Sequence, residues 1–533
     1  MSATLEVPTN TDTPEPDESL PDASVLEDRT PEWCRMSAAV AAFLLTLGLV
    51  LIIFANRPLW HSDLWDHINY GEHILQHQSV AKTEPLVALA KGMPTVNTAW
   101  LSQIGMAFLY RTDGLGLPAL QFAYAALIVI SLAAVGYTVT KRCGSAAFGI
   151  LSCAIFLAVN WQQFLIVRPQ SVGVAFFSIV LAVLATGGIR SRVSWVALPL
   201  MFAVWANCHG SFAMGLLLMG LVVVGRVVDV FLQTRSLSQA FRSRPTIRLI
   251  LLTQLCAAAA LLNPSGLAIY HEVLRVGSHP NIATMFEWDP LTLRMQQGQL
   301  AAGAAVLLLF ALRFSPRRLR AVEMLPLLVT GGMAMWSGRM LNWFAPVCAM
   351  VICVHAAAAW RAMKKIERRT VPYRRTGLWT VVSLGLCWVF FGFTSLGLQT
   401  IHGKTPELHR ALSRGTPVQP LEYLNSLAEV PPGIAFMPAE WAGFLTRSGP
   451  ADLQPMVNLH VHVIPEQVWS DYVRLIDGPA DWEGLLDRYG INFVIADKIR
   501  NARLIQVLRE SDDYETQYED VQAAMFVRVK TIR

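Results

Sequence analysis

Long apolar runs recur along roughly the first 400 of the 533 residues, and no other feature constrains the fold as strongly. A helix needs about 20 consecutive apolar residues to cross a bilayer, where no water is available to hydrogen-bond an open backbone. Only 15% of the residues are charged, against about a quarter in a typical soluble domain. The sequence therefore predicts a polytopic α-helical membrane protein with about 11 transmembrane helices. The predicted spans are residues 36–56, 117–139, 145–161, 170–187, 194–208, 210–228, 248–263, 298–313, 321–337, 341–359 and 377–398.

Lysine and arginine gather in alternate connections between these spans, which predicts the orientation of the chain. The basic connections lie near residues 141–142, 190–192, 226–248, 313–320 and 361–375. By the positive-inside rule these connections face the cytoplasm, so the amino terminus is inside and everything after residue 400 is outside. Residues 1–35 are acidic and poor in apolar side chains, and we expect a disordered cytoplasmic tail there.

The composition changes near residue 401, after the last apolar run. Helical and strand patterns alternate in residues 401–533, which predicts a small α/β extracytoplasmic domain. A strand is predicted for residues 455–463, and in it Asn458, His460 and His462 would share one face. Two histidines on one face can bind a metal, but no third ligand is evident, and ordinary strand residues are the favoured interpretation.

A large first outer loop, residues 57–116, follows the first predicted span and begins with closely spaced ionisable groups. If the loop opens with a helical turn, Asp63, Asp66, His67 and Tyr70 lie on one face. A carboxylate or a histidine can take a proton from a hydroxyl that attacks another group. This face is therefore a candidate site at the outer membrane surface.

Short motifs follow one another in a fixed order along the chain. They are Asp63–His67 (DLWDH), Arg168–Gln170 (RPQ), Trp205–Phe212 (WANCHGSF), Leu262–Gly266 (LNPSG), Glu287–Trp288 (EW) and Arg339. In this order they resemble a bacterial multipass membrane family with the fold of the GT-C glycosyltransferases, mannosyltransferase-like enzymes that depend on polyprenyl-phosphate sugars. The resemblance implies a GT-C-like transmembrane domain over residues 36–400 in the bacterial cytoplasmic (inner) membrane.

The resemblance also implies roles for single residues. An acid in the first outer loop is expected to be catalytic, which assigns Asp63 as base, with Asp66 and His67 beside it. Phosphate or substrate binding falls to a second group on the same side: Arg168, Asn207, His209 and Arg339. Arginine suits this role because its planar fork matches phosphate oxygens. We expect Asp63, Arg168, His209 and Arg339 to line one outward-opening cavity.

One departure from the family pattern leaves the cofactor open. The acids are spaced as Asp-Leu-Trp-Asp, whereas the family's acid pair is adjacent or separated by one residue. The sequence therefore assigns no metal, and a divalent cation such as magnesium or manganese stays an open alternative. Glu287 and Asp289, which flank Trp288 in a long outer loop, are predicted to be solvated acids rather than catalytic groups.

The leading functional prediction is transfer of a sugar from a polyprenyl-phosphate-linked donor to a glycan, lipid or protein acceptor on the outer face of the membrane. One alternative is a transporter or flippase for a lipid-linked or polar solute. A transporter typically shows internal repeats and ionisable groups near mid-membrane, and neither is evident in this sequence. A non-catalytic membrane assembly protein is the third possibility. The lipid bilayer is an expected partner and nucleic acid is not.

Overall fold

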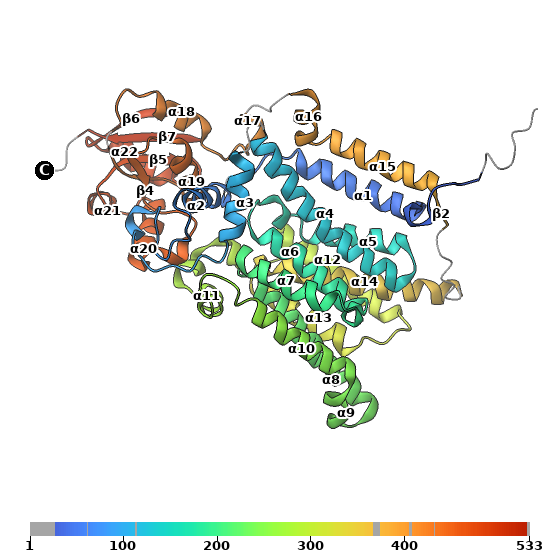
Figure 1. Ribbon diagram of the computed structural model, residues 1–533. Helices are drawn as coiled ribbons and strands as arrows, with labels where there is room; N and C mark the ends of the chain where they lie inside the picture. The colour runs from blue at the N-terminus through green and yellow to red at the C-terminus, as the bar shows by residue number, and fades with distance from the viewer. Residues whose placement is uncertain are drawn as a thin grey trace, which may run out of the picture.

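The computed structural model describes residues 27–60, 62–111, 115–365, 374–403, 408–430 and 432–529. Residues 1–26 of the predicted tail therefore lie outside the described residues. Each predicted span is occupied by a helix or, for the last, by a bent helix pair (Figure 1). These helices are α1 (Ala38–Ala55), α4 (Gly116–Cys143), α5 (Ala146–Val159), α6 (Gln170–Ala185), α7 (Ser194–Cys208), α8 (Phe212–Thr234), α10 (Arg244–Ala259), α12 (Gln296–Phe314), α13 (Ala321–Trp336), α14 (Leu341–Lys364), α15 (Gly377–Gly392) and α16 (Ser395–His402).

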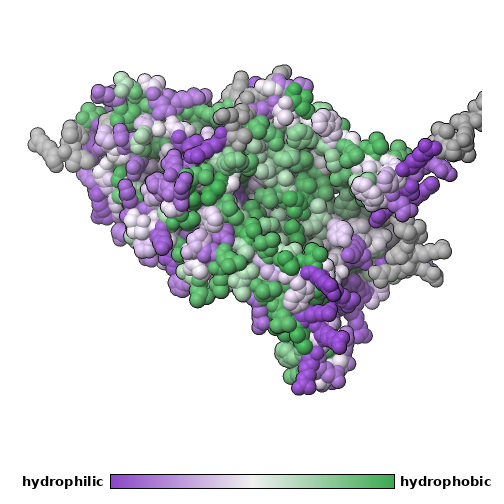
Figure 2. Space-filling model, in the orientation of Figure 1, coloured by the Kyte–Doolittle hydropathy of each residue, from purple (hydrophilic) through white to green (hydrophobic). Residues whose placement is uncertain are grey.

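Five segments in the described part of the chain are long and apolar enough to cross a membrane: α1, α4, α8, α12 and Gly338–Lys364, which contains α14. The pair α15 and α16, bent by 85°, would make six. Helices α5, α6, α7 and α13 are apolar but shorter. Figure 2 shows a broad apolar surface over these helices, bordered by hydrophilic residues at both ends. The chain is therefore a multi-pass membrane protein, while the count of about 11 spans stays a prediction.

Helix α14 forms the centre of the helical unit. In its span 83% of the apolar window is buried, against 17–50% in the other four long segments. It packs against α4, α5, α6, α12 and α13. A helix that is apolar on every side is suited to a core position, because no face of it has to meet water. The outer helices can therefore present apolar side chains to lipid while α14 holds them together.

The predicted first outer loop, residues 57–116, carries one helix toward each of its ends. It contains α2 (Leu64–His77), the 3-10 turn η3 (Ala88–Ala90) and α3 (Trp100–Arg111). The predicted helical turn is confirmed, with Asp63 at the position that precedes the first residue of α2. At Gly71 an added Cβ would lie 2.0 Å from the carbonyl oxygen of Gln103, so glycine is needed where α2 crosses α3. This crossing fixes α2 at one end of the helical unit.

The C-terminal unit is a five-stranded sheet with helices around it, drawn in orange and red in Figure 1. Strand order is β4-β3-β5-β7-β6, with β4, β3 and β5 parallel and β7 and β6 antiparallel to their neighbours. The elements are α17 (Leu408–Ala411), α18 (Val418–Ser426), β3 (Gly433–Phe436), α19 (Ala439–Ser448), β4 (Leu453–Pro455), η9 (Val461–Val463), α20 (Glu466–Ile476), α21 (Trp482–Arg488), β5 (Ile491–Asp497), α22 (Ala502–Glu510), β6 (Tyr514–Glu519) and β7 (Ala523–Arg528).

The predicted strand over residues 455–463 is wrong. Strand β4 ends at Pro455, and the chain then turns into η9. The turn forms because the Asn458 side-chain oxygen accepts a hydrogen bond from the backbone N–H of His460 at 3.0 Å. Such local side-chain bonds favour turns over strands. The turn brings His460 to the first outer loop.

Helix α19 joins the C-terminal unit to α2 (Figure 1). The Trp65 and Phe444 rings lie 5.0 Å apart between centroids, and Asn69 donates a side-chain hydrogen bond to the Gly443 carbonyl at 2.9 Å. Arg447 of α19 reaches the buried Glu72 of α2 at 3.6 Å. The contact thus combines apolar and charged pairs, and it gives the C-terminal unit a fixed place beside the first outer loop.

Candidate active site

A cavity of about 770 Å³ lies where three parts of the chain meet: the first outer loop, one end of the helical unit and the C-terminal unit. Its ionisable and aromatic lining includes Asp63, His67, Tyr70 and Glu84 from the loop, His209, Glu272, Glu287, Trp288 and Arg339 from the helical unit, and Glu440, His460, His462 and Arg500 from the C-terminal unit. A concave site of this size, with a few converging polar groups, is typical of ligand-binding pockets. The cavity is therefore the strongest candidate for a functional site.

Four charged side chains form a cluster at one wall of the cavity. Arg168 lies 2.6 Å from a Glu287 oxygen and 3.5 Å from an Asp63 oxygen. Arg339 lies 3.4 Å from the same Glu287 oxygen and donates to the Gln170 side chain at 3.0 Å. This charge cluster of Asp63, Arg168, Glu287 and Arg339 balances two cations with two anions.

Three of the four residues that we expected to share a cavity do line it: Asp63, His209 and Arg339. Arg168 does not line it, but its side chain lies directly behind, only 4% exposed and joined to Asp63 and Glu287. Glu287 corrects a prediction, because it is not a solvated acid but the carboxylate that holds both arginines. Its guanidinium partners came from distant parts of the sequence, so no local pattern could reveal the pairing.

Burial and charge act in opposite directions on the acids of the cluster. Burial raises the pKa of Asp63 above the usual carboxyl range, although the Arg168 guanidinium opposes it. Burial also acts to raise the pKa of Glu287, but Arg168 and Arg339 outweigh it and hold that pKa below the usual value. Asp63 is thus the better proton acceptor of the two, since a base needs a pKa close to the working pH.

Asp66 lies one helical turn from Asp63 but does not line the cavity. It is 5% exposed, and its carboxylate accepts a hydrogen bond from the Leu459 backbone N–H at 3.3 Å. Burial raises its pKa to about 7, and the nearby Asp63 and Glu84 charges add to this shift. The structure therefore separates the two acids that the sequence grouped, because Asp66 faces the C-terminal unit instead.

Besides His462, three imidazoles line the cavity, and burial lowers the pKa of each. His67, with a pKa lowered to about 3, meets the Gln103 side chain at 3.2 Å. His209 accepts a hydrogen bond from the Ser211 N–H at 3.0 Å. His460 stacks on Tyr70 with ring centroids 4.3 Å apart. All three rings are neutral at pH 7 and can accept or donate hydrogen bonds to an uncharged polar ligand.

Asn207 is the predicted binding residue whose position does not support that role. Its side-chain oxygen accepts from the Trp100 indole at 2.7 Å, and its amide donates to the Leu262 carbonyl at 2.8 Å. These bonds tie the end of α7 to α3 and leave the side chain outside the described cavity lining. Asn207 therefore stabilises the part of the cavity wall that carries His209.

Sequence reasoning missed several lining residues. His460 was assigned to a strand, and Glu440 and Arg500 gave no signal at all, because only the folded C-terminal unit brings them to the loop. The Trp288 ring, also in the lining, lies 5.3 Å from the Arg339 guanidinium. This stacking orients the arginine at the cavity wall.

A divalent cation does not fit this donor set. Asp63 pairs with Arg168, and Asp66 is turned away toward a backbone N–H. Among the residues that the structure describes, no group of three or more His, Cys, Asp and Glu is arranged to hold a metal ion. We therefore derive no chemical step through a metal.

Solved structures share this architecture. The oligosaccharyltransferase of Archaeoglobus fulgidus, tethered with an acceptor peptide, matches with a TM-score of 0.51 at 12% identity, covering 92% of this chain and 74% of its own. ArnT of Cupriavidus metallidurans, bound to undecaprenyl phosphate, matches with a TM-score of 0.51 at 14% identity, over 92% of this chain and 98% of its own. No protein-family model and no curated protein matches the sequence.

These likenesses establish the fold. The chain has the GT-C fold of polytopic membrane glycosyltransferases, as the motif order indicated. At 12% and 14% identity the likeness concerns the arrangement of the helices and not the chemistry of this cavity.

Proposed function

We propose that the chain is a membrane glycosyltransferase, which transfers a sugar from a polyprenyl-phosphate-linked donor to an acceptor on the outer face of the bacterial cytoplasmic membrane. The observation that carries the proposal is the cavity in which Asp63, with a raised pKa, lies beside Arg168 and Arg339. The fold supports it, since ArnT of Cupriavidus metallidurans was solved bound to undecaprenyl phosphate in the same fold.

In this mechanism Asp63 acts as the general base. An acceptor hydroxyl attacks the anomeric carbon of the donor, and its proton passes to the Asp63 carboxylate. The bond between the anomeric carbon and the phosphate oxygen breaks, and the lipid phosphate leaves with the bonding electrons. Burial strengthens Asp63 as a base, because it disfavours the charged form and raises the pKa.

Arg339 is the residue we assign to the leaving phosphate. It lines the cavity, whereas Arg168 stands behind it and holds Glu287. A guanidinium can donate two hydrogen bonds to phosphate oxygens as negative charge develops there. Glu287 holds Arg339 at the cavity until the phosphate arrives. The contact between Glu287 and Arg339 is 3.4 Å, longer than the 2.6 Å contact between Glu287 and Arg168, so Arg339 is the arginine that is more easily released.

Neutral imidazoles are suited to binding the hydroxyl groups of the sugar. His67, His209 and His460 present rings that burial keeps uncharged, so they can hydrogen-bond hydroxyl groups without competing for the phosphate. A transporter is the weaker interpretation, because its site is expected near the bilayer midplane between repeats. This cavity lies at one end of the helical unit, and the C-terminal unit forms one of its walls.

The test is sugar transfer from a labelled polyprenyl-phosphate donor by the purified full-length chain. We expect Asp63→Asn to lower transfer by 100-fold or more, on the order of the loss of a general base. Asp289→Asn is the matched control, because Asp289 lines the same cavity but belongs to no ion pair among the described residues. Equal activity of Asp63→Asn and the wild type would remove Asp63 from the mechanism.

A further inference from the structure

A chain of buried hydrogen bonds joins the first outer loop to the turn that follows β4 in the C-terminal unit. The Asp66 carboxylate accepts from the Leu459 backbone N–H at 3.3 Å. The Asn458 side-chain amide donates to the Tyr70 hydroxyl at 3.4 Å, and that hydroxyl donates to Glu84 at 2.8 Å. We call the four side chains, each at most 5% exposed, the docking network: Asp66, Tyr70, Glu84 and Asn458.

Both ends of the docking network are tied to the backbone. The second Glu84 oxygen accepts from the N–H groups of Leu86 and Val87 at 2.8 and 3.1 Å. The Asn458 side-chain oxygen accepts from the His460 N–H at 3.0 Å. A buried polar group that loses its partner costs free energy, so a network in which each member is paired favours a single arrangement. The turn is therefore held at one position relative to α2.

The position of the turn decides where the His460 ring lies. This ring stacks on Tyr70 with the two planes only 7° apart, and it lies 5.4 Å from the His67 ring. The backbone N–H of His460 is engaged by Asn458, whereas its ring nitrogens make no hydrogen bond among the described residues. The ring lines the large cavity. Its nitrogens are therefore available to a hydroxyl of a substrate, provided that the turn stays in place.

Two members of the docking network lie outside the described cavity lining: Asp66 and Asn458. Their side chains can affect a bound substrate only through a lining residue that they hold, and the turn makes His460 that residue. The C-terminal unit has a separate contact with α2 through α19. Loss of the network should therefore displace the His460 ring without separating the C-terminal unit from the first outer loop.

We propose that Asp66 and Asn458 are positioning residues, which hold the His460 ring where it hydrogen-bonds a hydroxyl of the sugar substrate. The inference rests on the proposed sugar transfer. It gives the C-terminal unit a part in substrate binding, because the first outer loop supplies the base Asp63 and the turn supplies His460 to the same cavity. It also gives Asp66 a role other than catalysis, since this carboxylate acts through the turn.

The test compares kcat/KM for sugar transfer from the labelled polyprenyl-phosphate donor by the full-length wild type and its variants. We expect Asp66→Ala, Asn458→Ala and His460→Ala each to lower kcat/KM roughly 3- to 10-fold, as for the loss of one hydrogen bond between uncharged groups. Adding Asp66→Ala or Asn458→Ala to His460→Ala should cause no further loss, because the ring that they hold is already absent. Asp66→Asn keeps an oxygen that can accept from the Leu459 N–H, so it should retain most of the activity.

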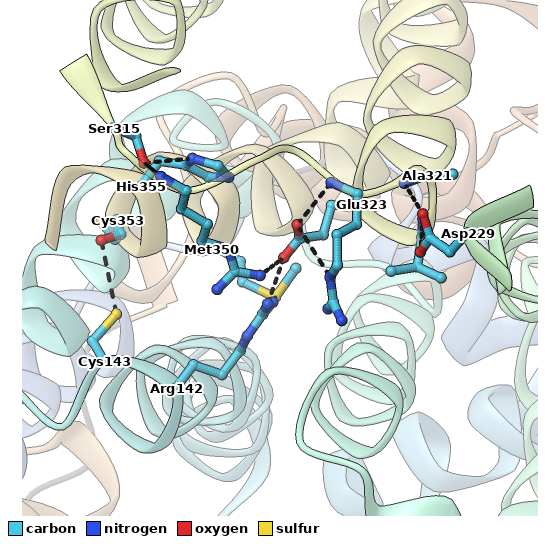
Figure 3. A network of polar contacts seen from close by, with 12 residues as sticks. Arg142, Cys143, Asp229, Ser315, Ala321, Glu323, Met350, Cys353 and His355 are labelled. Atoms are coloured by element: carbon cyan, nitrogen blue, oxygen red, sulfur yellow. Dashed lines mark hydrogen bonds and ion pairs between the residues drawn. The ribbon is translucent and has the colours of Figure 1, made fainter. Parts of the chain in front are cut away.

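Asp229→Ala is the matched control. Its carboxylate likewise accepts a backbone N–H of another element, that of Ala321 at 2.8 Å, in a polar network where α13 begins (Figure 3). The 16 residues of α13 span about 24 Å between that network and the end of the helix that leads to Arg339 at the cavity. Asp229→Ala thus removes a comparable bond far from the cavity, and kcat/KM should not change.

Hydrogen–deuterium exchange of residues 456–463 reports the position of the turn without any sugar transfer. We expect several-fold faster exchange in Asp66→Ala, because the Leu459 N–H loses its acceptor, and no change in Asp66→Asn. Unchanged exchange in Asp66→Ala would overturn the docking role whether or not the chain transfers sugar. A wild type that transfers no sugar but shows the expected exchange would instead remove the proposed function, and with it the part of His460 in binding.

Three kinetic outcomes would overturn the positioning role while sugar transfer stands. The first is a wild-type kcat/KM in both Asp66→Ala and Asn458→Ala. The second is a wild-type kcat/KM in His460→Ala, which would mean that the ring does not contact the substrate. The third is a loss in the double variants that multiplies the losses of the single ones, which would mean that the network acts on stability and not through His460.

Discussion

Asp63 and Asp66 are three residues apart on one helix, yet their neighbours give them different chemistry. Asp63 meets Arg168 and the open cavity, whereas Asp66 meets the Leu459 N–H and is almost fully buried. Burial without a cationic partner raises the pKa of Asp66 to about 7. A carboxyl of this kind titrates near neutral pH and makes the stability of the α2 contact depend on pH.

The sign of this dependence is fixed by the direction of the shift. The pKa of Asp66 rises from 3.8 to about 7 on folding, so the folded state holds the proton more tightly between these values. The free energy of unfolding therefore falls as pH rises through this window, by roughly 4 kcal/mol at most. We expect Asp66→Asn to be more stable than the wild type above pH 7, with the gap closing toward pH 4.

Thermal unfolding of both proteins across this pH range checks the prediction. Asp289→Asn is the control, because it removes a carboxylate that is only partly buried. A stability difference between Asp66→Asn and the wild type that does not change with pH would contradict a raised pKa at Asp66.

Residues of the site differed in how far the sequence could predict them. Asp63 was predictable, because a motif and the position after an apolar run both marked it. Glu287 was noticed but misread, since its partners Arg168 and Arg339 are 119 and 52 residues away. His460 was missed because a turn made by Asn458 replaced the predicted strand. The predictions for Glu287 and His460 failed because each position depends on a contact, long-range or local, that a linear pattern does not contain.

At the scale of elements, the crossing of α2 and α19 depends on a glycine. A Cβ at Gly443 would lie 2.6 Å from both the Asp66 backbone nitrogen and one of its carboxylate oxygens. Neither helix can move away freely, since Trp65 and Phe444 are packed beside this point. Gly443→Ala should therefore lower the stability of the chain by about 1–3 kcal/mol, the usual cost of overpacking.

The measurement is thermal unfolding, with Gly484→Ala as the matched control. Gly484 lies within α21, and an added Cβ there meets no atom within 4 Å. Alanine favours a helix over glycine by up to about 1 kcal/mol, so this control should be neutral or stabilising. A Gly443→Ala protein as stable as the wild type would show that α2 and α19 can separate without cost.

The helices formed by long apolar runs were the predictable part of the fold. Every predicted span contains a helix, because an apolar run in a bilayer has to satisfy its backbone internally. The 85° bend between α15 and α16 was not predicted. It falls at Phe393 and Thr394, where the Thr394 hydroxyl accepts from the Gly397 N–H at 3.0 Å and begins a new helix. One capping side chain within an apolar run is too weak a signal to mark a break.

At the scale of the whole molecule, the proposed orientation puts the large cavity outside the cell and the connection between α6 and α7 inside. We expect a cysteine at Asp477 to react with a membrane-impermeant maleimide in intact cells and a cysteine at Ser191 to react only after lysis. Both positions are exposed, in the C-terminal unit and in the α6–α7 connection respectively. Labelling of Ser191→Cys, but not Asp477→Cys, in intact cells would reverse the orientation.

The ribosome makes α1 before the other long helices and α15 after them, yet the two helices pack together. Strand β1 (Met36–Ser37) pairs with β2 (Arg375–Thr376), and Gly48 lies directly against the Phe390 ring. At 5–20 residues per second, roughly 20–70 seconds separate the synthesis of these partners. For that time one face of α1 has to be shielded by lipid or by the insertion machinery. The wall of the cavity that carries His460 is translated later still, so a competent site can exist only on a finished chain.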